Sequence, residues 1–315
     1  MKVIEHLAQS KEPPISFEII PPRRGGSLQS LMKLVSELAV HKPPFIDITS
    51  HPAVISYEDG PQGLRRVVKR KRPGTLGVCA LVQHKFGIDA VPHVICRGFT
   101  KEETEDFLIE LHYLGIDNVL AIRGDDNGYD KPIADGRSNN PFARDLVEQL
   151  NEMNHGRYLD KNQSSDPTTF CIGVSGYPEK HFEAPNMTED LKNLKAKVDA
   201  GAEYIVTQMF FNNEHYFRFV DACRNEGITV PIIPGLKILS SERQLSMLPK
   251  TFWCELPEEL VAKARSVDPK KIVEVGIEWT VKQSKELLKE GVPSLHYYIM
   301  QNTRSVGEVL KQLKG

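Results

Sequence analysis

The stretch CIGVSGYPEKHFEAPNMTEDLKNLKAKVDAGAEYIVTQMF, residues 171–210, contains one complete repeating unit of the predicted fold. It opens with the apolar run Cys171–Ser175 and closes with Tyr204–Phe210. Continuous apolar runs of this length are typical of parallel strands that are covered on both faces. Between them, Thr188–Ala200 has helical periodicity, with Thr188 as the expected N-cap and Gly201 as the glycine after the last turn. Strand, capped helix and strand predict a βαβ unit.

The same alternation continues in both directions from this unit. Further strands are expected at Ile15–Ile20, Phe45–Thr49, Val91–Cys96, Val119–Arg123, Pro231–Gly235 and Ser294–Ile299. Further helices are expected at Leu28–Val40, Lys101–Leu114, Glu214–Glu226, Pro269–Glu290 and Ser305–Leu313, the second opened by a capping box of Thr100 and Glu103. The polar segments Asp126–Asn140 and Asn154–Thr169 read as insertions, the second on the N-terminal side of the strands.

Eight strand–helix repeats fit either a barrel or a doubly wound sheet. The sequence contains neither G-x-G-x-x-G after a strand nor a GxxxxGK[ST] phosphate loop, which weakens the second alternative. We therefore predict an α/β protein with a (β/α)8 TIM barrel as a single domain over residues 1–315, without a regulatory domain.

Composition excludes several classes of protein. Lys and Arg total 40 against 42 for Asp and Glu, whereas a nucleic-acid-binding chain normally has a basic excess. The five cysteines form no CxxC pair, so we expect reduced thiols and no metal site. No stretch has the apolar length of a signal peptide or a membrane span. A cytoplasmic protein that binds neither membrane nor nucleic acid is expected.

Polar side chains occur at or near the ends of most predicted strands, where barrel enzymes carry their chemistry. These residues are Glu18, Thr49, His51, His93, Arg123, Asp125, Tyr177, His181, Gln208 and Tyr298. Each has an ordinary structural interpretation, since a carboxylate in a strand is more often ion-paired than catalytic. By themselves they indicate a barrel enzyme with an unknown reaction.

The same residues lie in motifs that resemble the methylenetetrahydrofolate reductase family. Ser16–Arg23 (SFEIIPPR) is similar to the N-terminal signature of that family. Further matching blocks are Ile46–Ala53, Pro92-His93, Ala121–Asp125, Gly176–Ala184 (GYPEKHFEA), Asp190–Ala202, Thr207–Phe211 and Ile233–Gly235. The resemblance runs from about Ser16 to the C-terminus, and ordered blocks over a whole barrel are far more specific than any single motif.

The resemblance implies FAD as cofactor, NADH or NADPH as co-substrate, and reduction of 5,10-methylenetetrahydrofolate to 5-methyltetrahydrofolate by ping-pong hydride transfer. It implies Glu18 as the general acid, with a pKa raised by its apolar strand, and Asp125 as a catalytic carboxylate near flavin and folate. Glu18, Gln208 and Tyr298 would contact the folate. The implied flavin contacts are Thr49, His93, Arg123, Gly124, Asp125, Tyr177, His181, Ala184, Asp190 and Lys197. A homo-oligomer is also expected.

Three positions depart from the family pattern. Glu242 stands where many members carry an aromatic residue that touches the nicotinamide, which opens the choice among NADH, NADPH and a protein electron donor. Asn302 replaces an arginine that would meet the folate glutamate tail, with Arg304 nearby. The loop Asp126–Asn140 is longer than a minimal one.

Two alternative functions stay open on the sequence. One is a flavin-free barrel lyase or isomerase that uses Glu18 as acid–base. The other is a flavin- or folate-binding subunit that takes electrons from a protein.

Overall fold

The computed structural model describes residues 1–61, 63–126, 128–161 and 165–314. Its main sheet is parallel, and the strands follow one another in the order β10-β11-β1-β2-β5-β6-β7-β8-β9. The bounds are β1 (Ile15–Ile19), β2 (Phe45–Ile48), β5 (Asp89–Ile95), β6 (Asn118–Ile122), β7 (Cys171–Gly176), β8 (Tyr204–Thr207), β9 (Ile232–Ile233), β10 (Gly235–Leu236) and β11 (Leu295–Met300). The predicted TIM-type barrel of one α/β domain is confirmed.

The barrel closes through a strand that is interrupted at Pro234. β9 pairs with β8 and β10 pairs with β11, so the two short pieces together complete the circle. Proline has no N–H to donate, which breaks the ladder at this point. The Oγ1 of Thr207 on β8 compensates by accepting a hydrogen bond from the backbone N–H of Gly235 at 2.9 Å. A Cβ at Gly235 would lie 2.3 Å from the carbonyl oxygen of Thr207, so only glycine fits there.

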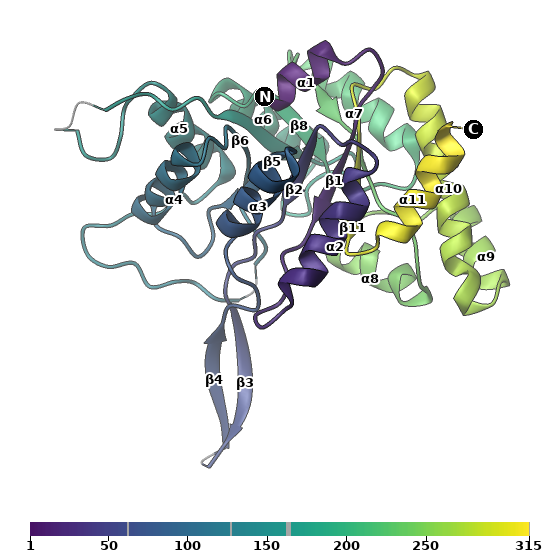
Figure 1. Cartoon of the computed structure of the whole chain (residues 1–315), viewed down its shortest axis with the longest axis horizontal. Coiled ribbons are helices and arrows are strands. Elements are labelled where there is room, and N and C mark those ends of the chain that lie inside the picture. Colours follow the sequence, from purple (N-terminus) through teal and green to yellow (C-terminus); the bar gives the residue numbers. More distant parts are fainter. Residues whose placement is uncertain (62, 127, 162–164, 315) are drawn as a thin grey trace.

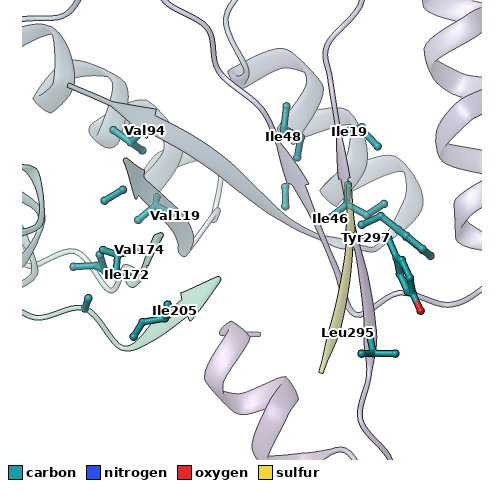
Figure 2. Close-up of a cluster of buried hydrophobic side chains, with 14 of the residues drawn as sticks. Ile19, Ile46, Ile48, Val94, Val119, Ile172, Val174, Ile205, Leu295 and Tyr297 are labelled. Carbon is teal, nitrogen blue, oxygen red and sulfur yellow. The ribbon is translucent and has the colours of Figure 1, made fainter. Parts of the chain in front are cut away.

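Helices surround this barrel and bury its outer face. They are α2 (Leu28–Ala39), α3 (Leu76–Phe86), α4 (Lys101–Tyr113), α5 (Ala143–Asn154), α6 (Met187–Asp199), α7 (Asn213–Asn225), α10 (Ile272–Lys289) and α11 (Thr303–Lys314). Outward-facing strand residues such as Ile46, Val119 and Ile205 pack beneath them in one continuous cluster. Figure 2 shows members of this cluster on strands all around the barrel. Alternate residues therefore point inward, and these positions build the site.

The N-terminal helix α1 (Val3–Gln9) closes one end of the barrel. Val3 packs with Phe45, Tyr204 and other interior side chains, and its backbone N–H bonds Asn118. Gly173 on β7 gives space to the Tyr204 ring, since a Cβ there would lie 2.2 Å from that ring. This end is thus filled with apolar side chains, and chemistry is left to the opposite end.

A hairpin outside the barrel was not predicted. β3 (Val54–Gly60) and β4 (Gly63–Lys69) form an antiparallel pair that projects away from the barrel as a separate arm (Figure 1). Its side chains are mostly exposed, including Tyr57 and Leu64. Helices α8 (Glu242–Phe252) and α9 (Glu258–Ser266) are further additions, and they pack with Met209 and Phe211 in a second apolar cluster.

Several local predictions are confirmed and others are wrong. The capping box of Thr100 and Glu103 is present on α4, and Gly201 follows α6 with φ +125°. The predicted cap Thr188 is wrong, because Asn186 caps α6 by accepting from the N–H of Glu189. His93 lies within β5 rather than at its start. The region Pro269–Glu290 contains a short 3-10 turn, Pro269–Lys271, before α10.

The two predicted insertions follow β6 and α5. Within them, residues 127 and 162–164 lie outside the described part of the chain. In the described residues, no helix is long and apolar enough to cross a membrane.

Candidate active site

The open end of the barrel is polar on one half and apolar on the other. Strands β11, β1, β2 and β5 carry polar interior side chains, and β6 to β9 carry mainly apolar ones. The polar group is formed by Glu18, Asp47, His93 and His296. His93 and Glu18 are on strands separated by β2, so their side chains can meet only inside the barrel. The cluster therefore lies below the opening.

Glu18 is the member of this cluster that reaches the opening. Its side chain is nearly buried, and Oε1 accepts a hydrogen bond from the Thr49 hydroxyl at 2.9 Å. Its other oxygen, Oε2, lies 3.4 Å from Nε2 of His93. The structure thus brings three predicted site residues together at the ends of β1 and β2 and within β5.

The expected direction of the Glu18 pKa is wrong. Burial acts to raise this pKa and is the largest influence, but it is outweighed by the charges of His93 and His296 and by the Thr49 hydrogen bond. The pKa of Glu18 is therefore lowered while His93 is protonated. Burial also lowers the pKa of His93. When His93 loses its proton, its charge no longer opposes the effect of burial on Glu18, so the acid and the histidine titrate as a coupled pair.

Asp47 is as completely buried as His296, and the sequence reasoning missed it. It is 0% exposed and lies next to Glu18 in the β1–β2 register. Burial raises the pKa of Asp47 to about 7, His296 opposes this effect, and Glu18 reinforces it. The signal was available, because a carboxylate inside the apolar strand FIDI is as unusual as Glu18 in ISFEI.

Further predicted residues lie around the mouth. Asp125 is exposed after β6, and its charge and that of Glu18 both act on the intervening His51. Gln208 follows β8, and its side-chain oxygen accepts from the backbone of Met209. The hydroxyl of Tyr298 on β11 reaches past the interrupted strand and donates to the carbonyl of Thr207 on β8 at 2.6 Å. These side chains bracket the opening above Glu18 from three sides.

Lys237 was not anticipated from the sequence. Its ammonium donates to the carbonyl oxygen of Tyr298 at 2.8 Å. Burial lowers the pKa of Lys237 to about 8, against the opposing charge of Glu18. The opening therefore also holds a buried cation that faces the acid.

A pocket of about 400 Å³ lies beside the opening, between the ends of β6 and β7 and helix α6. It gathers a large part of the flavin-contact residues predicted from the resemblance: Arg123, Tyr177, His181, Ala184, Asp190 and Lys197. Thr49 and His93 lie at the Glu18 cluster instead, and Gly124 and Asp125 lie on the rim next to Arg123. The predicted set thus divides into a deep part and a lateral pocket.

The lateral pocket is basic where it is deepest. Lys197 is partly buried, its ammonium donates to the carbonyl of Ser175 at 2.6 Å, and desolvation lowers its pKa to about 8. Arg123 pairs with Glu183 at 2.6 Å, and Asp190 accepts from the backbone N–H of His181 at 2.8 Å. Tyr177 packs edge-on against His181, with ring centroids 4.6 Å apart.

Two lining residues of this pocket were not predicted from the sequence. Phe142 and Arg144 line it from the start of α5, a helix that was not predicted. The exposed Phe142 ring offers a flat apolar surface, and Arg144 adds a cation. The cations of Arg123, Arg144 and Lys197 match the diphosphate of a dinucleotide such as FAD, and the Phe142 ring matches its base. The pocket residues therefore fit the cofactor that the resemblance implies.

The structure shows where two departures from the family pattern lie, at Asn302 and Glu242. The side chain of Asn302 accepts from the backbone N–H of Ser305 and donates to its hydroxyl, so it caps the start of α11. Glu242 is exposed at the first turn of α8. Among the described residues, no group of His, Cys, Asp or Glu is arranged to hold a metal ion.

The fold and the site define a (β/α)8-barrel protein with an acid at the barrel opening and a basic nucleotide-sized pocket beside it. The methylenetetrahydrofolate reductase family model matches residues 3–314, and the chain belongs to this family.

Relatives of this chain are found in bacteria and eukaryotes. It is 31% identical over 288 residues to the 5,10-methylenetetrahydrofolate reductase of Salmonella typhimurium, covering 91% of this chain and 86% of the relative. It is 30% identical over 314 residues to the "probable methylenetetrahydrofolate reductase (NADPH)" of Caenorhabditis elegans, covering 98% and 43%. It is 31% identical over 332 residues to the "probable methylenetetrahydrofolate reductase (NADH)" of Oryza sativa subsp. japonica, covering 99% and 50%. The chain spans about half the length of these eukaryotic relatives.

Solved structures share the fold at low sequence identity. An uncharacterized protein from Clostridium thermocellum, described as binding two copies of 5-methyl-5,6,7,8-tetrahydrofolic acid, has a TM-score of 0.59 and 13% identity, covering 99% of this chain and 98% of that one. Oxaloacetate acetylhydrolase in complex with an inhibitor has a TM-score of 0.51 and 10% identity, covering 99% and 84%. These likenesses bear on the fold alone.

Proposed function

We propose that this protein reduces 5,10-methylenetetrahydrofolate to 5-methyltetrahydrofolate with FAD as cofactor and a nicotinamide nucleotide as electron source. The observation that carries the proposal is Glu18, a nearly buried acid held by Thr49 and His93 at the opening of the barrel. Family membership supports the substrate class.

The reaction needs a proton at a defined place. Protonating a ring nitrogen opens the five-membered ring of the substrate and leaves an iminium carbon that accepts hydride. Glu18 is positioned to donate this proton, since Thr49 fixes one carboxyl oxygen and leaves the other toward His93. The partly closed position of Glu18 also limits competition from water.

The lateral pocket is the proposed FAD site. Arg123 and Lys197 would hold the diphosphate, with Arg144 at the outer end and Phe142 against the base. FAD held there would supply two-electron hydride chemistry between the nicotinamide and the folate. Glu183 now pairs with Arg123 and would give way to the phosphate oxygens.

The remaining mouth residues orient the folate. Asp125 supplies negative charge near the cationic iminium, which stabilises it. Gln208 can both donate and accept hydrogen bonds at the pterin edge, and Tyr298 adds a hydroxyl on the opposite side. The names of the relatives include both NADH and NADPH, so the donor is a matter for measurement.

The test separates the two half-reactions in Glu18→Gln. We expect this variant to bind FAD and to be reduced by the nicotinamide at the wild-type rate, because neither step needs the acid. Folate turnover should fall by about 10²- to 10⁴-fold. Glu203→Gln is the matched control: it alters a partly buried carboxyl that accepts from the backbone N–H of Ile172 just before β8, at the closed end of the barrel. Wild-type folate turnover in Glu18→Gln would overturn the assignment.

A further inference from the structure

One nitrogen of the interior cluster faces two carboxyl groups. The Nε2 of His93 lies 3.4 Å from Oε2 of Glu18 and 3.9 Å from Oδ2 of Asp47. Both distances are slightly longer than a hydrogen bond, and contacts of this kind tighten in bound complexes. His93 is therefore placed to exchange a proton with either acid.

Asp47 has no structural use that accounts for its position. Among the described residues, none donates a hydrogen bond to either of its carboxylate oxygens. An unpaired carboxylate that is 0% exposed is strongly destabilising, so the group favours its protonated form. The pKa of about 7 that burial produces agrees with this expectation. A fold that merely needed to fill this space would be served better by an apolar side chain.

We propose that Asp47, His93 and Glu18 form a buried proton relay, in which Asp47 stores the proton that restores Glu18 to its acid form. The proposal rests on the proposed function, because it gives the acid of that reaction its proton supply. It adds a second functional carboxyl to the site, acting through His93 rather than on the substrate.

The proton count of the relay balances. Glu18 gives its proton to the substrate nitrogen and becomes a carboxylate. The proton of Asp47 then passes to Nε2 of His93 and from there to Oε2 of Glu18, which leaves Asp47 ionised. The depressed pKa of His93 suits this role, because the ring does not retain the proton. Glu18 is the most exposed member of the three, at 9% against 5% for His93. When the site opens to water after turnover, the proton on Glu18 passes back through His93 to Asp47, and Glu18 takes a new proton from water.

Other titratable groups surround the relay of Asp47, His93 and Glu18 and interact electrostatically with it. His296 and His51 act on the pKa of relay members. In turn, the charge of Glu18 or Asp47 acts on the pKa of the surrounding residues Tyr298, Lys237, Tyr204 and Cys79. Of these, the Nδ1 of His296 is tied to the Ser16 hydroxyl at 2.8 Å. Its Nε2 lies 4.0 Å from Oε2 of Glu18, farther than the Nε2 of His93 at 3.4 Å.

The experiment measures the folate half-reaction of pre-reduced enzyme against pH in wild type and Asp47→Asn. An ionised Asp47 favours the protonated form of Glu18, and the amide cannot do so. We expect the alkaline midpoint to move down by about one pH unit, so that the rate falls about tenfold on the alkaline side and converges with wild type at acidic pH. Reduction of the flavin by the nicotinamide should be unchanged. Cys171→Ser, a near-isosteric change at the closed end of the barrel, should keep the wild-type midpoint.

A uniform loss of rate at all pH values, with the midpoint unchanged, would overturn the relay and leave Asp47 a structural role. A second measurement does not need Asp47→Asn to fold. In ¹³C-aspartate-labelled protein, one buried carboxyl should titrate near neutral pH and shift to lower pH in Glu18→Gln, because the neighbouring negative charge is gone. No such carboxyl, or no shift, refutes the relay. If wild type reduced no folate at any pH, the proposed function would fail while this titration still tested the relay.

Discussion

Replacing Asp47 with asparagine should make the protein more stable at alkaline pH. The pKa of Asp47 is raised from 3.8 to about 7 by burial, so the folded chain binds more protons than the unfolded chain between these values. The contribution of protonated Asp47 to the free energy of unfolding is therefore fully present below about pH 4, and it is lost as the pH rises through about 7. The asparagine variant is neutral throughout and nearly isosteric, so it escapes this decline.

The size of the effect follows from the same numbers. A difference of about three pH units between the folded and unfolded pKa values corresponds to about 4 kcal/mol of lost stability above pH 7. Asp47 is fully buried, so solvent screening does not reduce this figure. We expect the free energy of unfolding of the variant to exceed that of the wild type by up to about 4 kcal/mol at pH 8 and by less than about 0.5 kcal/mol at pH 4.

The assay is urea denaturation at both pH values, with the slope of each transition checked for constancy. Glu179, whose pKa burial also raises to about 7, contributes equally to both proteins and cancels in the comparison. The exposed Asp221→Asn change serves as control and should leave stability unchanged at either pH. A variant that is less stable than wild type at pH 8 would refute the reasoning.

Three further predictions concern the site and its support. Asp125→Asn should slow folate reduction by about 10- to 100-fold with an unchanged melting temperature, and an unchanged rate in stopped-flow assays would argue against its electrostatic role. FAD affinity of the apoprotein should weaken as the pH rises through about 8, where Lys197 loses its charge, and Lys197→Met should bind weakly at all pH values; fluorescence titration decides this. Gly173→Ala should destabilise the fold by about 1–3 kcal/mol in denaturant titration, because its Cβ would lie 2.2 Å from the Tyr204 ring; wild-type stability would show that the ring can move.

The barrel was predictable because its strands are short, continuous apolar runs with polar residues after them. The helices α3 and α5 are about as long as the predicted α2, but each is reached through a long polar or charged segment. The hairpin β3–β4 buries little of its surface, so its sequence has no apolar face to reveal it. Periodicity detects an element through the surface that it buries, and the hairpin buries very little.

The site was predictable in its residue types but not in its electrostatics. The strand containing Glu18 indicated a buried acid, yet its pKa depends on His93 and His296, which lie far away in the sequence. Likewise, the partners of Lys197 and the place of Phe142 in the pocket exist only after the chain has closed into a barrel. Asp47 could have been found by the reasoning that singled out Glu18.

The central claim is most directly tested by the visible spectrum of the purified protein, reconstituted with FAD where needed. The spectrum is recorded before and after anaerobic addition of NADH and then NADPH, followed by 5,10-methylenetetrahydrofolate. We expect a flavin spectrum that one nucleotide bleaches and the folate restores. A protein that binds no flavin, or a reduced flavin that the folate does not reoxidise, would contradict the central claim.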